Sequence, residues 1–218
     1  MDGQTVLAVD VGGSHVKMRL SSDGADERRF YSGPRLTAKQ MVDRVKALTG
    51  DWSFDAVSIG IPAAIRDGSL VLEPVNLGKG WVGFDFEKAF GVPTKVVNDA
   101  AMQALGSYEG GKMLFLGLGT GLGSTLVVDG VVVPMELGHL PFRKATFEDY
   151  VGQRGRDRLG KKKWEKAVAE TVERLTAALE PDYVVLGGGN AKKLAKLPSN
   201  AKLGRNDNAF AGAFRLWD

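Results

Sequence analysis

Short apolar runs alternate along this chain with segments in which apolar residues recur every three or four positions. The first two runs lie at residues 5–10 and 15–20, and a further candidate lies at residues 27–31. Runs of this kind, separated by turn residues, predict an antiparallel meander of strands.

A helix is predicted to follow the meander over residues 37–50. Thr37 is a residue type that caps helices, and Gly50 is one that ends them. The apolar residues at helical spacing between these two are Met41, Val42, Val45 and Leu48.

The remainder of the first half predicts further strands and a second helix. Residues 55–62 have the composition of a buried strand, and Asp67 and Gly68 suit the turn of a short hairpin. Residues 94–106 change from an apolar run to helical spacing at Asn98, which predicts a strand that leads into a helix.

The second half begins as the first half does. The segment MLFLGLGTGLGSTLVV can be aligned with VLAVDVGGSHVKMRL at an offset of 107 positions. An internal duplication at this period argues for two similar lobes rather than one continuous sheet. The aligned pairs are Gly117 with Asp10, Gly119 with Gly12, and Gly121 with Ser14.

The last third of the chain predicts a long amphipathic helix over residues 164–179 and a strand over 182–190 that ends in glycines. A closing helix is predicted at residues 208–217. Strands and helices alternate throughout, so the predicted class is α/β, with an N-terminal lobe at residues 1–106 and a C-terminal lobe at 107–206.

Composition narrows the class of protein. A hydrophobic fraction of 44% and a charged fraction of 25% are typical of a soluble globular chain. No apolar run approaches the roughly 20 residues that cross a bilayer, and the first residues do not resemble a secretion signal, so we expect a cytoplasmic protein. The chain has no cysteine, which excludes disulfides and thiolate metal sites, and its net charge of +3 mildly favours polyanionic ligands.

The two glycine turns are candidates for anion binding. Glycines let backbone N–H groups approach an anion without side-chain collision, and consecutive N–H groups form a partly positive concavity. The chain has no GxxxxGK[ST] segment, and neither turn opens directly into a helix as a dinucleotide fingerprint requires. The alternative is that each is an ordinary tight hairpin turn, but a matched pair followed by LGGGN favours a ligand.

These segments resemble the actin, hexokinase and sugar-kinase superfold. DVGGSHVK and LGTGLGS are similar to its two phosphate segments, and LGGGN is similar to its adenosine segment. The resemblance implies a two-lobed actin-like ATPase fold, a duplicated ribonuclease H-like architecture with a cleft between the lobes, in which the final helix, residues 207–218, packs back on the first lobe. The donor-binding residues that it implies are Asp10, Gly12, Gly13, Ser14, His15, Lys17, Gly119, Thr120, Gly121, Gly123, Gly188, Gly189 and Asn190.

Asp10 is expected by this resemblance to face Mg²⁺ through water. A phosphoryl donor carries several negative charges, so a carboxylate beside it is repulsive unless a cation intervenes. Strand alternation leaves two orientations open for Lys17, toward the donor or toward solvent.

Asn98 and Asp99 stand where a strand is predicted to end and a helix to begin. Taken alone, they are typical helix caps. VVNDAAMQALG, however, resembles the ENDAN-like segment of sugar kinases of the ROK family, whose aspartate accepts the proton of the sugar hydroxyl. Asp99 matches that aspartate, and a carboxylate within hydrogen-bond reach assists a hydroxyl as its bond to phosphorus forms. Asn98 is then expected beside the sugar.

Three further segments resemble the sugar-binding parts of the family. MELGHLPF is similar to its GEIGH-like segment, which implies that Glu136 and His139 hold sugar hydroxyls. Glu148 in FEDYVG resembles a further sugar-binding glutamate, although an exposed acid at a helix start is an equally good interpretation. Asn76 in PVNLGKGW is placed at the sugar rim by the same comparison. Many family members bind zinc through three cysteines after the histidine, and the absence of cysteine here predicts no zinc.

Two segments, PFRKATFEDYVG and DYVVLGGGNAKK, look like the compact polyphosphate-dependent glucokinase branch of the family. Long-range attraction by basic side chains would suit a linear polyanion, although solvated surface charge is the alternative for each of them. Nucleic acid is a poorer fit, because aromatic residues do not interleave with this basic run. The residues are Arg143, Lys144, Lys161, Lys162, Lys163, Lys192 and Lys193.

The resemblance therefore implies a kinase that transfers a phosphoryl group from polyphosphate or ATP to the 6-hydroxyl of glucose. The alternatives are a kinase for mannose or an N-acetylated hexose, and a non-catalytic sugar-sensing member of the family. Sugar-sensing members of the family carry a DNA-binding region before the strand of the first phosphate segment, whereas nine residues precede Asp10 here. An actin-like filament or chaperone ATPase is disfavoured by VVNDAA together with ELGH. We expect a homodimer that binds neither membrane nor nucleic acid.

Overall fold

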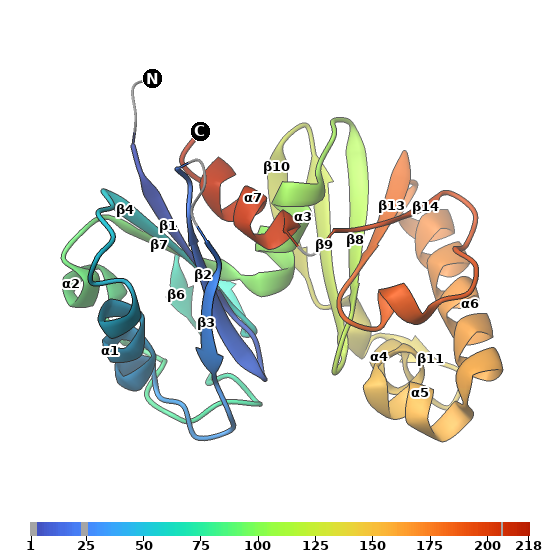
Figure 1. Ribbon diagram of the computed structural model, residues 1–218. Coiled ribbons are helices and arrows are strands. Elements are labelled where there is room, and N and C mark those ends of the chain that lie inside the picture. The colour runs from blue at the N-terminus through green and yellow to red at the C-terminus, as the bar shows by residue number, and fades with distance from the viewer. Residues whose placement is uncertain (1–3, 23–25, 206) are drawn as a thin grey trace. The chain divides into compact units, whose positions relative to one another are not determined.

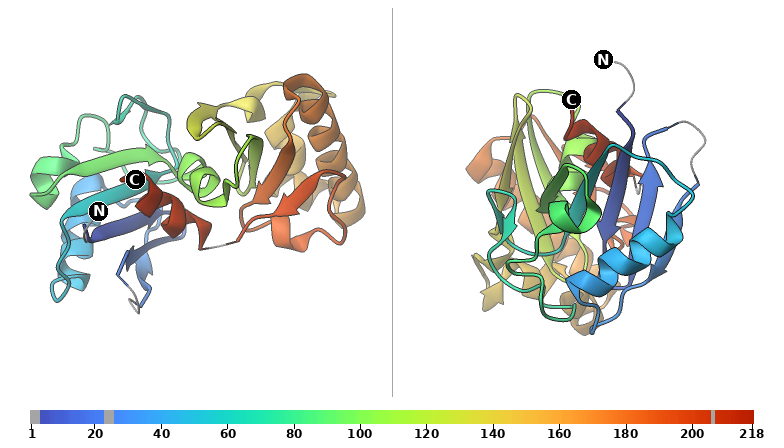
Figure 2. Two further views of the ribbon diagram at one scale, coloured as in Figure 1. Left: turned by 90° about the horizontal axis from the view of Figure 1, so that it is seen from above. Right: turned by 90° about the vertical axis from the view of Figure 1, so that its left-hand side faces the viewer.

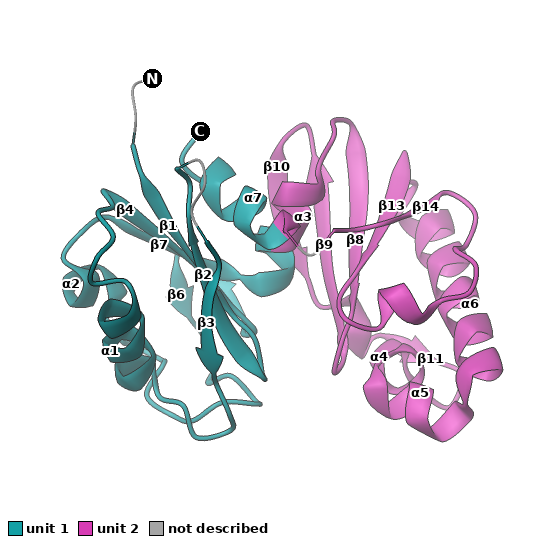
Figure 3. Cartoon of the chain, viewed as in Figure 1, with its two compact units in different colours: residues 1–102, 209–218 teal, residues 103–208 magenta. Residues whose placement is uncertain are grey.

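The computed structural model describes residues 4–22, 26–205 and 207–218. The chain forms two compact units, which Figure 3 shows in different colours. Unit 1 comprises Met1–Met102 and Ala209–Asp218, and unit 2 comprises Gln103–Asn208. The first boundary lies within helix α3 (Asp99–Ser107) and the second within α7 (Asn208–Arg215), so one helix runs across each boundary.

Unit 1 is built on a five-stranded sheet of order β3-β2-β1-β4-β7 (Figure 1). The β1–β2 and β2–β3 pairs are antiparallel, as the predicted meander requires, and the β1–β4 and β4–β7 pairs are parallel. The strands are β1 (Val6–Val11), β2 (His15–Leu20), β3 (Arg28–Tyr31), β4 (Ala56–Ile61) and β7 (Thr94–Asn98). The shorter elements are α2 (Phe86–Phe90) and the hairpin of β5 (Ile65–Arg66) and β6 (Ser69–Leu70).

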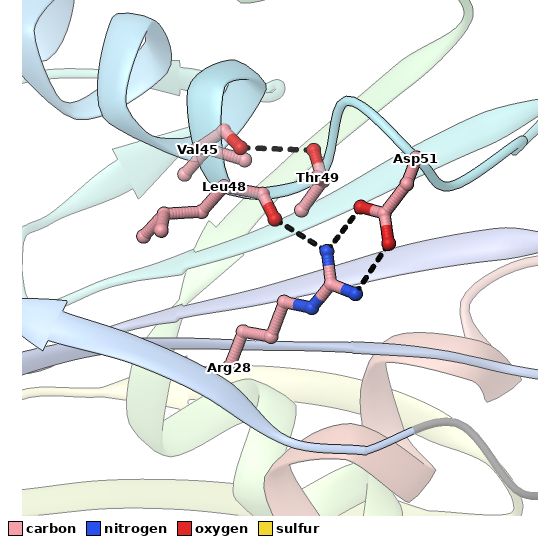
Figure 4. A network of polar contacts seen from close by, with 5 residues as sticks. All are labelled: Arg28, Val45, Leu48, Thr49 and Asp51. Carbon is pink, nitrogen blue, oxygen red and sulfur yellow. Dashed lines mark hydrogen bonds and ion pairs between the residues drawn. The ribbon is translucent and has the colours of Figure 1, made fainter.

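Helix α1 (Ala38–Leu48) covers one face of this sheet and confirms the predicted helix. Thr37 caps it in a capping box with Gln40. At its other end the Arg28 guanidinium donates to the Leu48 carbonyl and forms an ion pair with Asp51, in which Nη2 lies 2.7 Å from Oδ2 (Figure 4). These contacts join the edge strand β3 to the last turn of α1.

Helix α7 covers the opposite face of the sheet (Figures 1 and 2), where it packs on Ala8 of β1. The fully buried Ser58 of β4 joins the two: its hydroxyl donates to the Ala213 carbonyl at 2.7 Å and accepts from the Trp217 indole N–H at 2.8 Å. The sheet is therefore a central layer between helices on both faces.

We expect Ser58→Ala to lower the free energy of unfolding by about 1–3 kcal/mol, because it removes the partner of two groups beneath α7. Urea unfolding followed by tryptophan fluorescence measures the change. Ser69→Ala, at an exposed position on β6, is the matched control. Equal unfolding midpoints for the two variants would show that Ser58 does not hold the helix.

Unit 2 is built on a second five-stranded sheet, of order β10-β9-β8-β13-β14. Helix α6 (Lys161–Leu179) packs on it through a face that includes the fully buried Trp164. The strands are β8 (Lys112–Leu118), β9 (Leu122–Val128), β10 (Val131–Met135), β13 (Tyr183–Gly187) and β14 (Ala201–Leu203). The remaining elements are η1 (Leu137–His139), β11 (Pro141–Phe142), β12 (Ala145–Thr146), α4 (Phe147–Val151), α5 (Gln153–Leu159) and η2 (Ala191–Lys193).

The two sheets have the same topology, which confirms the internal duplication. In unit 2 the β8–β9 and β9–β10 pairs are antiparallel and the β8–β13 and β13–β14 pairs are parallel, as in unit 1. The offset of 107 holds for the first strand of each hairpin but becomes 106 after the turn, because Val11 pairs with Val16 whereas Leu118 pairs with Leu122. The turn of unit 2 is thus one residue shorter, which an ungapped alignment misses.

Two predicted helix limits differ from the structure. Helix α6 begins at Lys161 rather than at residue 164, since its three leading lysines are exposed and follow no apolar period. Helix α7 ends at Arg215, after which the chain turns so that Trp217 reaches Ser58. Among the helices of the described residues, none combines the length and the apolarity that crossing a bilayer requires.

Candidate functional site

Asp10 lies in a row of three residues across adjacent strands of unit 1. Lys17 is its partner in the antiparallel β1–β2 pair, and Gly60 is its partner in the parallel β1–β4 pair. Side chains directly opposite each other in such a pair point to the same face of the sheet. Lys17 therefore points to the same face of the sheet as Asp10.

The Asp10 carboxyl has a raised pKa, so it is a weaker acid than an ordinary aspartate. Burial raises its pKa to about 6 from 3.8, because the ionised form loses hydration. The charge of Lys17 opposes this shift, and the charge of Glu27 adds to it. A cation at this carboxylate would replace part of the lost hydration.

Asp99 begins helix α3 above the same face. The absence of a side chain at Gly60 allows this approach, because a Cβ there would lie 3.4 Å from the Asp99 Cα and 3.0 Å from the Met102 sulfur. The strand that carries Gly60 neighbours the strand that carries Asp10. Unit 1 thus brings the predicted base and the predicted metal-facing carboxylate to one region, and Asp99 is half-buried at the first residue of α3.

Asn98 caps this helix. Its Oδ1 accepts hydrogen bonds from the backbone N–H groups of Ala100 and Ala101, at 2.9 and 3.3 Å, and its Nδ2 donates to the Ala63 carbonyl at 3.0 Å. The capping interpretation is correct, and these contacts fix the direction in which α3 leaves the sheet. One amide hydrogen of Asn98 is not used by them.

The β1–β2 turn is held from within the unit. The Gly12 N–H donates to the His15 carbonyl at 2.9 Å, and the Ser32 hydroxyl donates to the Gly12 carbonyl at 2.8 Å. Gly13 is exposed, and a Cβ there would lie 3.7 Å from the Asn76 Cβ, so the predicted sugar-rim residue lies beside the turn. Neither Gly12 nor Gly13 has a positive φ, so the backbone conformation does not require glycine there. The lack of a side chain instead lets other groups approach the turn closely. Ser14 and His15 are exposed at the same turn.

In unit 2 the β8–β9 turn and the LGGGN segment lie together. Gly188, at a φ of 79°, passes so close to Leu118 that a Cβ would lie 2.5 Å from the Leu118 carbonyl oxygen. The buried Asn190 side chain donates to the Gly119 carbonyl at 3.1 Å and accepts from Lys193 Nζ at 2.8 Å. Both of these contacts are within unit 2, so Asn190 ties the two segments together, and Thr120 and Gly189 are exposed.

The other predicted sugar-binding residues of unit 2 also converge. Glu136 immediately precedes the short helix η1, whose last residue, His139, donates its backbone N–H to the Glu136 carbonyl at 3.2 Å. His139 Nε2 lies 3.8 Å from Oε1 of Glu148 on α4. Glu136 and His139 are exposed and Glu148 is half-buried. An acid and an imidazole at this spacing offer acceptors and donors that hydroxyl groups require.

Sequence reasoning missed a residue that supports the glycine turn of unit 2. The Gln153 backbone N–H donates to the carbonyls of Gly119 and Thr120 at 3.0 and 3.1 Å. A glycine immediately before Gln153, at the junction of α4 and α5, was the one local signal of such close packing.

Whether Mg²⁺ fits this site depends on one protein side chain, that of Asp10. In residues 4–22, 26–205 and 207–218, no three histidine, cysteine or acidic side chains converge where they could hold a metal ion. Mg²⁺ commonly keeps several waters and binds through one or two carboxylates plus substrate phosphates. Asp10, a carboxylate beside a glycine turn, fits that mode of binding.

A model of the ROK family matches residues 6–156. Polyphosphate glucokinase of Mycobacterium tuberculosis (strain ATCC 25618 / H37Rv) is 25% identical over 211 residues, which cover 87% of this chain and 79% of that protein. Kanosamine kinase of Amycolatopsis mediterranei (strain S699) is 28% identical over 173 residues, 68% of this chain and 56% of that protein.

Among solved structures, inorganic polyphosphate/ATP-glucomannokinase from Arthrobacter sp. strain KM aligns with a TM-score of 0.84 at 22% identity. The alignment covers 99% of this chain and 100% of that one. The likeness confirms the predicted two-lobed α/β fold of the actin-like ATPases.

Proposed function

The chain belongs to the ROK family, and from this membership we propose that it is a kinase that phosphorylates the 6-hydroxyl of glucose with polyphosphate or ATP. The names of the relatives support a sugar kinase, and those of the mycobacterial and Arthrobacter proteins support these donors. The single observation that carries the proposal is the convergence of Asp10 and Asp99 over Gly60 on one face of unit 1.

In the proposed reaction the sugar hydroxyl attacks the terminal phosphorus of the donor, whose bridging P–O bond breaks. Asp99 accepts the proton that the hydroxyl loses. Mg²⁺, when bound at Asp10, neutralises charge on the phosphates. Backbone N–H groups of the two glycine turns bind the phosphate oxygens, and Asn190 keeps the second turn in shape.

We assign the sugar contacts to the residues that resemble the family's sugar-binding segments. Hydroxyls of the sugar need charged acceptors and donors, because buried polar groups without partners are costly. The pairing of His139 with Glu148 supports this assignment, since it holds two of these groups together in unit 2. The residues are Asn76, Asn98, Glu136, His139 and Glu148.

A coupled assay tests the proposal. Glucose, mannose and an N-acetylated hexose are each supplied with polyphosphate or ATP, with and without Mg²⁺, and sugar phosphate is measured. We expect turnover of glucose that needs Mg²⁺. Absence of turnover with every pair would refute the kinase, and sugar binding without turnover would instead support a sugar-sensing role.

A further inference from the structure

We infer that Gly121, in the glycine turn of unit 2, is a positioning residue for Glu148 and so controls sugar affinity rather than donor affinity. The inference rests on the proposed function, because it takes Glu148 as a sugar ligand. The turn that contains Gly121 resembles a phosphate segment, so by resemblance alone it is expected to bind the phosphoryl donor. The contacts of Gly121 point to the sugar instead.

The side chain of Glu148 occupies the space that a side chain at Gly121 would need. A Cβ on Gly121 would overlap Glu148 Oε2 and would lie 3.5 Å from its Cδ and 3.8 Å from its Cβ. The same carboxylate carries Oε1, which faces His139 Nε2 at 3.8 Å. A methyl group at position 121 therefore meets the functional end of Glu148 directly.

Helix α4 cannot move aside to relieve this overlap. Its start is fixed by a capping box between Thr146 and Asp149, and Phe147 and Val151 anchor it in the core of unit 2. At the end of α4 Gly152 packs on the turn that contains Gly121: a Cβ there would lie 2.6 Å from the Thr120 carbonyl oxygen and 3.1 Å from the Gly121 Cα. In an interior packed this closely, an added methyl group displaces the neighbour that moves most easily, which here is the Glu148 carboxylate.

Gly138 closes the other side of the same space. A Cβ on Gly138 would lie 2.8 Å from the Leu122 carbonyl oxygen and 3.5 Å from the Glu148 Cβ. Glycines from three segments thus lie near Glu148, and the one whose added Cβ would overlap its side chain is Gly121. The carboxylate of Glu148 can yield to an added methyl group only by leaving its place beside His139.

Gly119 provides a matched control in the same turn. A Cβ on Gly119 would have nothing within 4 Å, so it would point into open space. Neither Gly119 nor Gly121 has a positive φ, so alanine fits the backbone at both positions. The two alanine variants differ in what the methyl group meets: Glu148 at position 121, and the space left for the donor at position 119.

The experiment measures glucose binding by calorimetry without donor, and the KM values for glucose and for polyphosphate or ATP. Loss of one hydrogen bond to a charged group predicts that Gly121→Ala weakens glucose binding about tenfold or more, with a donor KM within about twofold of the parent chain. Gly119→Ala is expected to raise the donor KM and to leave glucose binding unchanged.

A double-mutant cycle separates positioning from a general loss of structure. Glu148→Ala removes the group that the methyl displaces, so adding Gly121→Ala to it should leave glucose binding and the unfolding midpoint unchanged. A further loss in the double variant, or a Gly121→Ala effect on the donor KM alone, would overturn the inference. If the parent chain binds no hexose at all, the proposed function fails instead.

Discussion

Replacing Asp99 with asparagine is expected to lower kcat by about a hundredfold or more while glucose binding is retained. Asparagine has the size of aspartate, and its amide oxygen can still accept the hydrogen bond that the Ala100 N–H donates to Asp99 Oδ1 at 2.9 Å. It cannot accept the proton of the sugar hydroxyl. The change therefore removes the proposed base and keeps the start of α3.

Steady-state kinetics with saturating glucose and calorimetry without donor measure the two quantities. Asp85→Asn is the matched control, since Asp85 caps α2 in the same unit by accepting from the Lys88 N–H at 2.9 Å. The control should turn over glucose as the parent chain does. Near-normal kcat in Asp99→Asn would remove Asp99 from the mechanism.

The second large effect is a pH-dependent stability that Asp10 imposes on the metal-free protein. The folded chain holds a proton on Asp10 up to a pKa of about 6, whereas the unfolded chain releases it near 3.8. Since the folded state binds more protons between these values, the free energy of unfolding should fall by about 3 kcal/mol as the pH rises from about 4 to above 6. In Asp10→Asn this contribution is absent.

Urea unfolding in EDTA at several pH values measures this effect. Trp52, Trp81 and Trp217, three of the four tryptophans, lie in unit 1 and report on its unfolding by fluorescence. The variant should match the parent chain near pH 4 and exceed it in stability above pH 6. Asp67→Asn, at an exposed turn position with a φ of 50° that asparagine tolerates, is the control. Parallel stability curves for Asp10→Asn and the parent chain would contradict the burial of a charge at Asp10.

Local patterns in the sequence were sufficient to predict most of the elements. The Thr37 capping box, the Asp67–Gly68 turn and the change of period at Asn98 each depend on residues close in the chain, and each is present. The duplication was also visible, because both hairpins keep a glycine turn between apolar strands.

Features that depend on contacts between distant segments could not be predicted from such patterns. Gly121 and Glu148 meet only because α4 packs against the β8–β9 turn, and Asn190 reaches Gly119 only because β13 is parallel to β8. The raised pKa of Asp10 arises from burial, which no spacing of residues encodes. The shorter turn of unit 2 was missed because glycines on both sides allow an alignment without a gap.

The row that contains Asp10, Lys17 and Gly60 has a counterpart in unit 2 that consists of Gly117, Gly123 and Gly187. The ring of Phe115 lies against that row: a Cβ at Gly117 would lie 3.4 Å from the ring, and a Cβ at Gly187 would overlap it.

The acid of this row is therefore present in unit 1 and absent from unit 2, so the two units cannot take each other's place. Two copies of the first half would carry two acids in this row, and two copies of the second half would carry none. The two sheets keep the same pattern of strand pairing, whereas only unit 1 carries an acid in this row.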